Sequence, residues 1–127
     1  MSPLWKPNQD RIDPSRPLYE QFVEQLRADI ARGELPPGTR LPSVRELAAA
    51  ARVNPTTVMK TYQELERIKL IVTHRGQGTF VTNDEKAILD SKRTIARAAV
   101  SKLREVAESL DLSLEQLLKL ANTEEDE

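Results

Sequence analysis

The chain has 127 residues, one histidine, no cysteine and a formal net charge of −1. This length allows one modest core with a short addition, and it is too small for a large enzyme fold. The lack of cysteine excludes disulfides, thiolate metal sites and cysteine nucleophiles, and one histidine disfavours a histidine metal site. The sequence also shows no nucleophile-base pair, no metal-ligand cluster and no glycine-rich phosphate loop after a strand, so we expect no cofactor, no metal and no catalytic centre.

The N-terminal segment, residues 1–15, is expected to be an arm, because its three prolines interrupt any helical period. Leu4 and Trp5 are apolar enough to dock, and we expect Trp5 to pack against the body of the protein or a partner subunit. The segment is polar, and nowhere does the chain have the run of about 18 apolar residues that suggests a membrane span. We therefore expect a cytoplasmic protein with no membrane partner.

Two helices are expected next. The first runs from about Pro17 to Arg32, with proline at its first position and Gly33 as its stop, and its apolar residues recur every fourth position. The second begins at Ser43, where the residues SVRE form a capping box. The Ser43 hydroxyl accepts a hydrogen bond from the Glu46 amide, and the Glu46 carboxylate accepts one from the Ser43 amide. Its four alanines at 48–51 allow close approach of a neighbouring helix.

A third helix and a β-hairpin follow. Asn54 is suited to cap the third helix and Pro55 to take its first position, so the break after the second helix is a short turn. This helix ends near Lys69. Two short β-prone runs then flank a glycine-rich tip at residues 74–78, which is typical of a hairpin because glycine adopts the positive φ of tight loops.

From Asp84 onward the composition changes to helix formers. Apolar residues mark a stripe of about seven turns, which predicts a long amphipathic helix. A last helix is expected at Ser113, with Gln116 as its capping-box partner. The residues that we expect to form a dimer interface on the stripe are Ile88, Ile95, Val100, Leu103, Val106 and Leu110.

This order of elements predicts a winged helix-turn-helix, so the expected fold class is mainly α with a small β-hairpin. On the third helix, Lys60, Gln63 and Arg67 lie within about 40° of Thr56, while the apolar residues occupy the opposite side. Hydroxyl, amide and cationic side chains on one face can bond phosphate oxygens or base edges. A helix N-terminus adds amide donors for phosphate.

Charge supports nucleic acid as the partner. Residues 40–82 hold seven basic and three acidic side chains, whereas residues 83–127 hold seven and eleven. Arg45 is expected near the same groove, and the hairpin tip near a minor groove or phosphate. Glu64, which flanks the polar face of the third helix, does not fit this interpretation. In a DNA groove a carboxylate can accept a hydrogen bond only from a cytosine amino group, and it otherwise repels the duplex. The expected DNA-binding residues are Arg45, Thr56, Thr57, Lys60, Gln63, Arg75 and Gly76.

Other interpretations remain open from the residues alone. The polar face of the third helix could simply be solvated, and Arg45 could pair with Glu46 or Glu64 at the surface. Winged helices also serve as protein-protein interaction modules that do not bind DNA. A third alternative is a sensor gated by a small ligand, bound between the C-terminal helices.

Four runs between Pro17 and Val81 occur together: GELPPGTRLPSVRELA, VNPTTV, YQELE and RGQGTFV. With these runs, the segment resembles the DNA-binding domain of the GntR family of bacterial transcription regulators. The resemblance implies that Arg45 contacts DNA, that Thr56 and Thr57 hold phosphate, and that Gly76 lies in the wing near the minor groove. Many members have a second arginine where this chain has Met59, so one base-reading contact is expected to differ.

The C-terminal region is too short for the ligand-binding or aminotransferase-like domains of larger family branches. It is similar to the YtrA subfamily, whose brief helical C-terminal region dimerises. We therefore expect residues 16–82 to be the DNA-binding domain and residues 83–127 a dimerisation region. The resemblance implies a homodimeric regulator, which we expect to be a repressor, bound to a palindromic double-stranded operator; the sequence does not identify an effector.

Overall fold

The computed structural model describes residues 4–124, and the chain divides between Ser91 and Lys92 into two compact units. In chain order the elements are η1 (Gln9–Arg11), α1 (Leu18–Ala31), β1 (Arg40–Leu41), α2 (Val44–Ala51), α3 (Pro55–Arg67), β2 (Ile71–His74), β3 (Gly78–Val81), α4 (Glu85–Ser109) and α5 (Leu114–Asn122). The predicted class, mainly helical with a small sheet, is confirmed.

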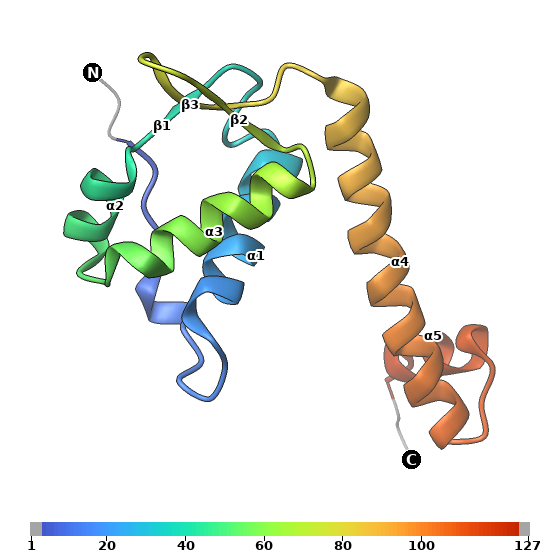
Figure 1. The fold of residues 1–127 in the computed structure, drawn as a ribbon. Helices are drawn as coiled ribbons and strands as arrows, with labels where there is room; N and C mark the ends of the chain where they lie inside the picture. The colour runs from blue at the N-terminus through green and yellow to red at the C-terminus, as the bar shows by residue number, and fades with distance from the viewer. Residues whose placement is uncertain (1–3, 125–127) are drawn as a thin grey trace. The chain divides into compact units, whose positions relative to one another are not determined.

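The core of the first unit lies where the helices meet. Both α1 and α2 pack against α3, and β2 contacts α3 as well (Figure 1). Each helix turns one apolar stripe inward and leaves its polar stripe in water, as the sequence periodicity predicts. The fully buried side chains include Phe22 and Leu26 from α1, Leu47 from α2, and Val58 and Leu65 from α3.

The capping boxes predicted at two helix starts are both present. Glu46 N donates to Ser43 Oγ over 3.0 Å and Ser43 N donates to Glu46 Oε1 over 2.8 Å, which completes the capping box. The Ser113 box at the start of α5 is also formed. Pro17 differs from the prediction: it stands at the N-cap position, one residue before α1, and not at the first helical position, because its ψ of 134° is not helical.

The first unit also contains a three-stranded antiparallel sheet, with its strands in the order β1-β3-β2. The predicted hairpin is present as β2 and β3, and His74 pairs with Gly78 at its tip. The short strand β1 was not predicted. It pairs Arg40 with Phe80 and Leu41 with Thr79, so a segment that reads as a proline-glycine connector is tied to the hairpin.

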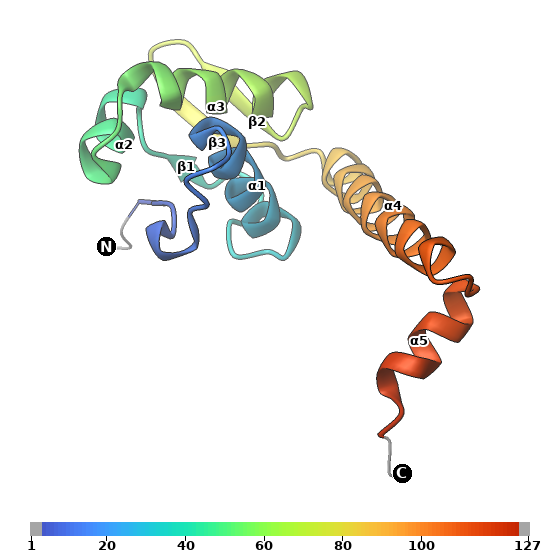
Figure 2. The ribbon, with the colours of Figure 1, turned by 90° about the horizontal axis from the view of Figure 1, so that it is seen from below.

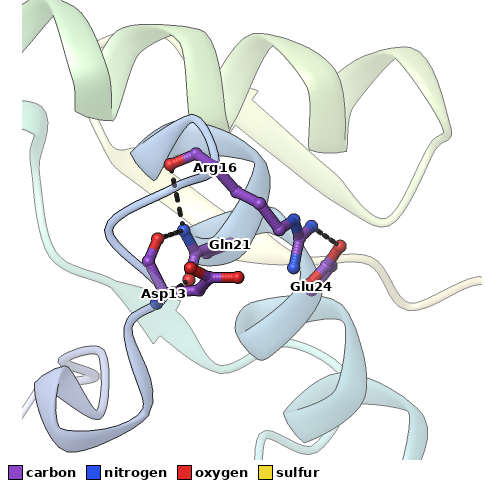
Figure 3. A network of polar contacts seen from close by, with 4 residues as sticks. All are labelled: Asp13, Arg16, Gln21 and Glu24. Carbon is purple, nitrogen blue, oxygen red and sulfur yellow. Dashed lines mark hydrogen bonds and ion pairs between the residues drawn. The ribbon is translucent and has the colours of Figure 1, made fainter.

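The N-terminal arm is held against α1. Trp5 packs on the core and its indole Nε1 donates to Asp29 Oδ2 over 2.8 Å. The buried Gln21 side chain accepts from Asp13 N and donates to the carbonyls of Asp13 and Arg16 (Figure 3). Because every polar atom of this amide is satisfied, the loop before α1 has one defined path.

Tyr62 provides a test of the core. Its hydroxyl donates to the buried Pro42 carbonyl over 2.6 Å, and burial raises the pKa of Tyr62 well above its usual value. Tyr62→Phe leaves that carbonyl without a donor, so we expect urea denaturation to show a loss of about 1–3 kcal/mol. Tyr19→Phe removes a hydroxyl that has no hydrogen bond within residues 4–124, and it should change stability little. Equal stabilities for the two variants would contradict this assignment.

The second unit has almost no core of its own. Within its described part, residues 92–124, only Ala107 is buried. Asp111 adopts a left-handed φ of 59° and ends α4, and Leu112 N then donates to Ala107 O over 2.8 Å. No helix in residues 4–124 is both long and apolar enough to cross a bilayer.

Candidate nucleic-acid interface

At the N-terminal end of α3 the backbone amides of Thr56 and Thr57 are bonded to Asn54, and the Thr56 side chain faces solvent. Asn54 Oδ1 accepts from Thr56 N over 2.8 Å, and Thr57 N donates to Asn54 O over 2.9 Å. Pro55 takes the first helical position, as predicted. The Thr56 side chain is exposed and the Thr57 side chain is half-buried. A hydroxyl beside a helix N-terminus is suited to bind a phosphate oxygen.

The middle of α3 carries the predicted cation and amide. Lys60 and Gln63 are both exposed, and the Lys60 ammonium lies 5.6 Å from the centre of the Tyr19 ring on α1. This cation-π contact holds Lys60 on the side of α3 that faces α1. Tyr19 was not predicted from the sequence, because the contact joins two helices. Met59 is 47% exposed.

Glu64, the discordant acid, is paired within its own helix. Arg67 Nε and Nη2 reach Glu64 Oε1 and Oε2 over 3.0 and 2.5 Å. Its hydrogen bonds with Arg67 lower the pKa of Glu64. The carboxylate therefore stays ionised, but its charge is matched one turn away. This pairing removes the objection that Glu64 repels a duplex, and it withdraws Arg67 from the free cations of the face.

Arg45 lies in the first turn of α2 and is exposed. The pairing with Glu46 or Glu64 that we considered is not present. The Glu46 side chain accepts from Ser43 N, and the Glu64 side chain accepts from Arg67. Within residues 4–124, Arg45 has no hydrogen bond or ion pair, so its guanidinium is available to a ligand.

The hairpin tip supplies a further cation. Arg75 is exposed, and Gly76 has a φ of 80°, a left-handed conformation that glycine adopts at little cost. The structure adds Arg40, which the pattern analysis did not select. A β-carbon at Gly78 would lie 3.2 Å from Arg40 Nε, so the Arg40 guanidinium lies against the hairpin close to its tip. Only the pairing of β1 with β3 reveals this.

The parts of the candidate interface lie on three segments around α3. The α2-α3 turn leads into the N-terminal end of α3, and the β2-β3 hairpin follows its C-terminal end (Figures 1 and 2). The exposed cations on these segments and in the first turn of α2 can bind anions by charge-assisted hydrogen bonds. The described residues contain no group of three acidic or histidine side chains placed to hold a metal ion.

The residues expected to form a dimer interface fall into two environments. Ile88 is half-buried against the core of the first unit. The other five are between 38% and 55% exposed: Ile95, Val100, Leu103, Val106 and Leu110. Leu118 and Leu120 on α5 are exposed too.

Comparisons with known proteins agree on one family. Residues 18–81 match the family of bacterial regulatory proteins described as the gntR family. The HTH-type transcriptional repressor YtrA of Bacillus subtilis is 41% identical over 110 residues, which cover 84% of this chain and 85% of YtrA.

Solved structures give the same result. A GntR family transcriptional regulator from Listeria monocytogenes superposes with a TM-score of 0.82 at 33% identity, covering 90% of this chain and all of that chain. AraR(DBD) in complex with operator ORE1 superposes with a TM-score of 0.50 at 30% identity, covering 53% of this chain and 82% of that one. The chain therefore belongs to the GntR family of transcriptional regulators and is YtrA-like, with a winged-helix DNA-binding domain.

Proposed function

We propose that this regulator binds a palindromic operator as a homodimer and represses transcription in the cytoplasm, without catalytic activity, metal or cofactor. The observation that carries the DNA-binding part is the exposure of Thr56, Lys60 and Gln63 on one face of α3, together with an exposed Arg45 side chain that has no hydrogen bond or ion pair within residues 4–124. Residues 16–82 form the DNA-binding domain. Its proposed contacts are Arg45, Thr56, Thr57, Lys60, Gln63, Arg75 and Gly76, and we include Arg40 because its side chain lies against the hairpin at Gly78.

Dimerisation through residues 83–127 is supported by the lack of a core in the second unit. Two helices with a single buried side chain between residues 92 and 124 cannot gain enough from burial to hold their shape. A second copy, related by a two-fold axis, would cover the apolar stripe on both chains at once.

Charge favours a second copy of this chain over an unrelated partner. Between Lys92 and Arg104 the sequence has five basic residues and no acidic one. Residues 105–127 have eight acidic residues and one lysine. An antiparallel arrangement of two copies would place each basic segment beside the acidic segment of the other, which favours that register over a parallel one.

The experiment is selection of bound sequences from random double-stranded DNA with the full chain. We expect an inverted repeat whose half-sites are about one helical turn apart, the spacing at which a two-fold dimer meets the same groove face. Affinity for the selected site should also fall steeply with salt, because each phosphate contact releases counterions.

The two alternative functions give different results in this selection. A protein-protein interaction module would enrich no sequence and would show no salt-dependent DNA binding. A ligand-gated sensor would bind DNA in only one of its two states, either with its metabolite bound or without it. A thermal-shift screen of a metabolite collection would then find a compound that stabilises the protein. A single enriched half-site without symmetry would contradict the homodimer and leave DNA binding standing.

A further inference from the structure

The turn between α2 and α3 contains a residue in a costly backbone conformation. Arg52 has φ 58° and ψ 48°, and its amide donates to Ala48 O. Val53 N also donates to Ala48 O, over 3.0 Å. This is the way in which helices end with a left-handed residue, and glycine is the residue most often found there because a β-carbon disfavours the conformation. The chain has arginine instead.

No contact within residues 4–124 offsets the cost of this conformation. Its side chain is exposed, with no hydrogen bond or ion pair to the described residues. A backbone outlier that brings no internal contact is reason to look for an external one.

Position indicates what that contact is. Arg52 follows the last turn of α2 and lies two residues before Asn54. Asn54 caps α3, which we call the recognition helix because it carries most of the proposed DNA contacts. A side chain in this turn lies outside α3, the element that would enter a groove, so it can approach the sugar-phosphate backbone more readily than base edges. Arginine suits a phosphate because its planar guanidinium can offer two parallel N–H donors.

A second residue makes a useful contrast. Lys69 is also an exposed cation with a left-handed φ, 66°, and it ends α3. It follows the C-terminal end of a helix of 13 residues, so it lies about 20 Å along α3 from the end that carries Asn54. Conformation and charge are therefore matched at the two sites, and only the proximity to the candidate interface differs.

We propose that Arg52 is an additional DNA-contacting residue that binds a backbone phosphate next to the recognition helix, and that folding stability is given up for this contact. The proposal rests on the DNA-binding function proposed above. It adds a sequence-independent contact, so Arg52 contributes affinity but does not discriminate between operators.

The test compares Arg52→Gly, Arg52→Lys and Lys69→Gly with the natural protein. Thermal unfolding gives Tm, and fluorescence anisotropy gives Kd for the selected operator and for an unrelated duplex at several salt concentrations. Both glycine variants should unfold a few degrees higher, because glycine relieves the left-handed residue.

Only Arg52→Gly should bind more weakly. We expect a loss of about 5- to 10-fold on both duplexes, and a slope of log affinity against log salt that is smaller by about 0.9, the value for one phosphate. Arg52→Lys should keep most of the slope. Unchanged affinity and slope in Arg52→Gly, or an equal loss in Lys69→Gly, would overturn the assignment. If the natural protein binds neither duplex, the proposed DNA-binding function itself fails.

Discussion

Arg45→Ala is expected to weaken operator binding about 10- to 100-fold, a loss of about 1–3 kcal/mol. The reason is geometric. Arg45 lies in the exposed first turn of α2 and has no intramolecular partner within residues 4–124. Its guanidinium therefore has no pairing to break before it meets a phosphate or a guanine edge. The measurement is Kd for the selected operator by electrophoretic mobility shift.

Folding should be almost unaffected, because alanine is a good helix former and the removed side chain is exposed. Tm is the check on this point. Arg11→Ala is the matched control: Arg11 is an exposed arginine of η1 whose side chain has no hydrogen bond or ion pair among the described residues. If Arg45→Ala binds as tightly as Arg11→Ala, then α2 takes no part in binding and the interface is smaller than we propose.

The second large effect is expected from Leu103→Asp, which should convert the dimer into a monomer. Leu103 is 40% exposed in the single chain, so aspartate there is tolerated by an isolated subunit. In a dimer that covers the stripe, the same carboxylate would be buried without a partner, which costs several kcal/mol in the association. Light scattering should report a single-chain mass.

Operator affinity should fall with the loss of dimerisation. Two linked half-site contacts become one, and bivalent binding of this kind contributes about 100-fold or more. Ser101→Asp introduces the same charge about 200° around the helix from Leu103, on the side away from the stripe. It should leave both the mass and the affinity unchanged. A dimeric Leu103→Asp would show that the partner helices meet elsewhere.

Local signals were predicted well from the sequence, and the reason is the short range of the interactions involved. The capping boxes at Ser43 and Ser113 join residues three apart, and the Asn54 cap joins residues two apart. Such contacts form once the chain becomes helical, whatever packs around them. The hairpin tip is similar, because Gly76 carries its own preference for positive φ.

Contacts between distant segments were not predictable from the pattern. The pairing of Arg40 with Phe80 spans the whole helix-turn-helix, and the contact between Tyr19 and Lys60 joins two helices. Helical periodicity assigns a residue to a face, but it does not say which other element lies against that face. For the same reason the sequence placed Ile88 with the exposed stripe, whereas the structure packs it on the core of the first unit.

By itself, then, the sequence determined the elements, their order and the polar face of the third helix, because these depend on interactions along one segment. Only the tertiary structure decided which of the charged groups remain available to a ligand. It paired Glu64 with Arg67, left Arg45 and Arg52 without partners in the described chain, and brought Arg40 to the wing. The physical reason is that charge pairing depends on distance in space, and distance between segments is set by how the core packs.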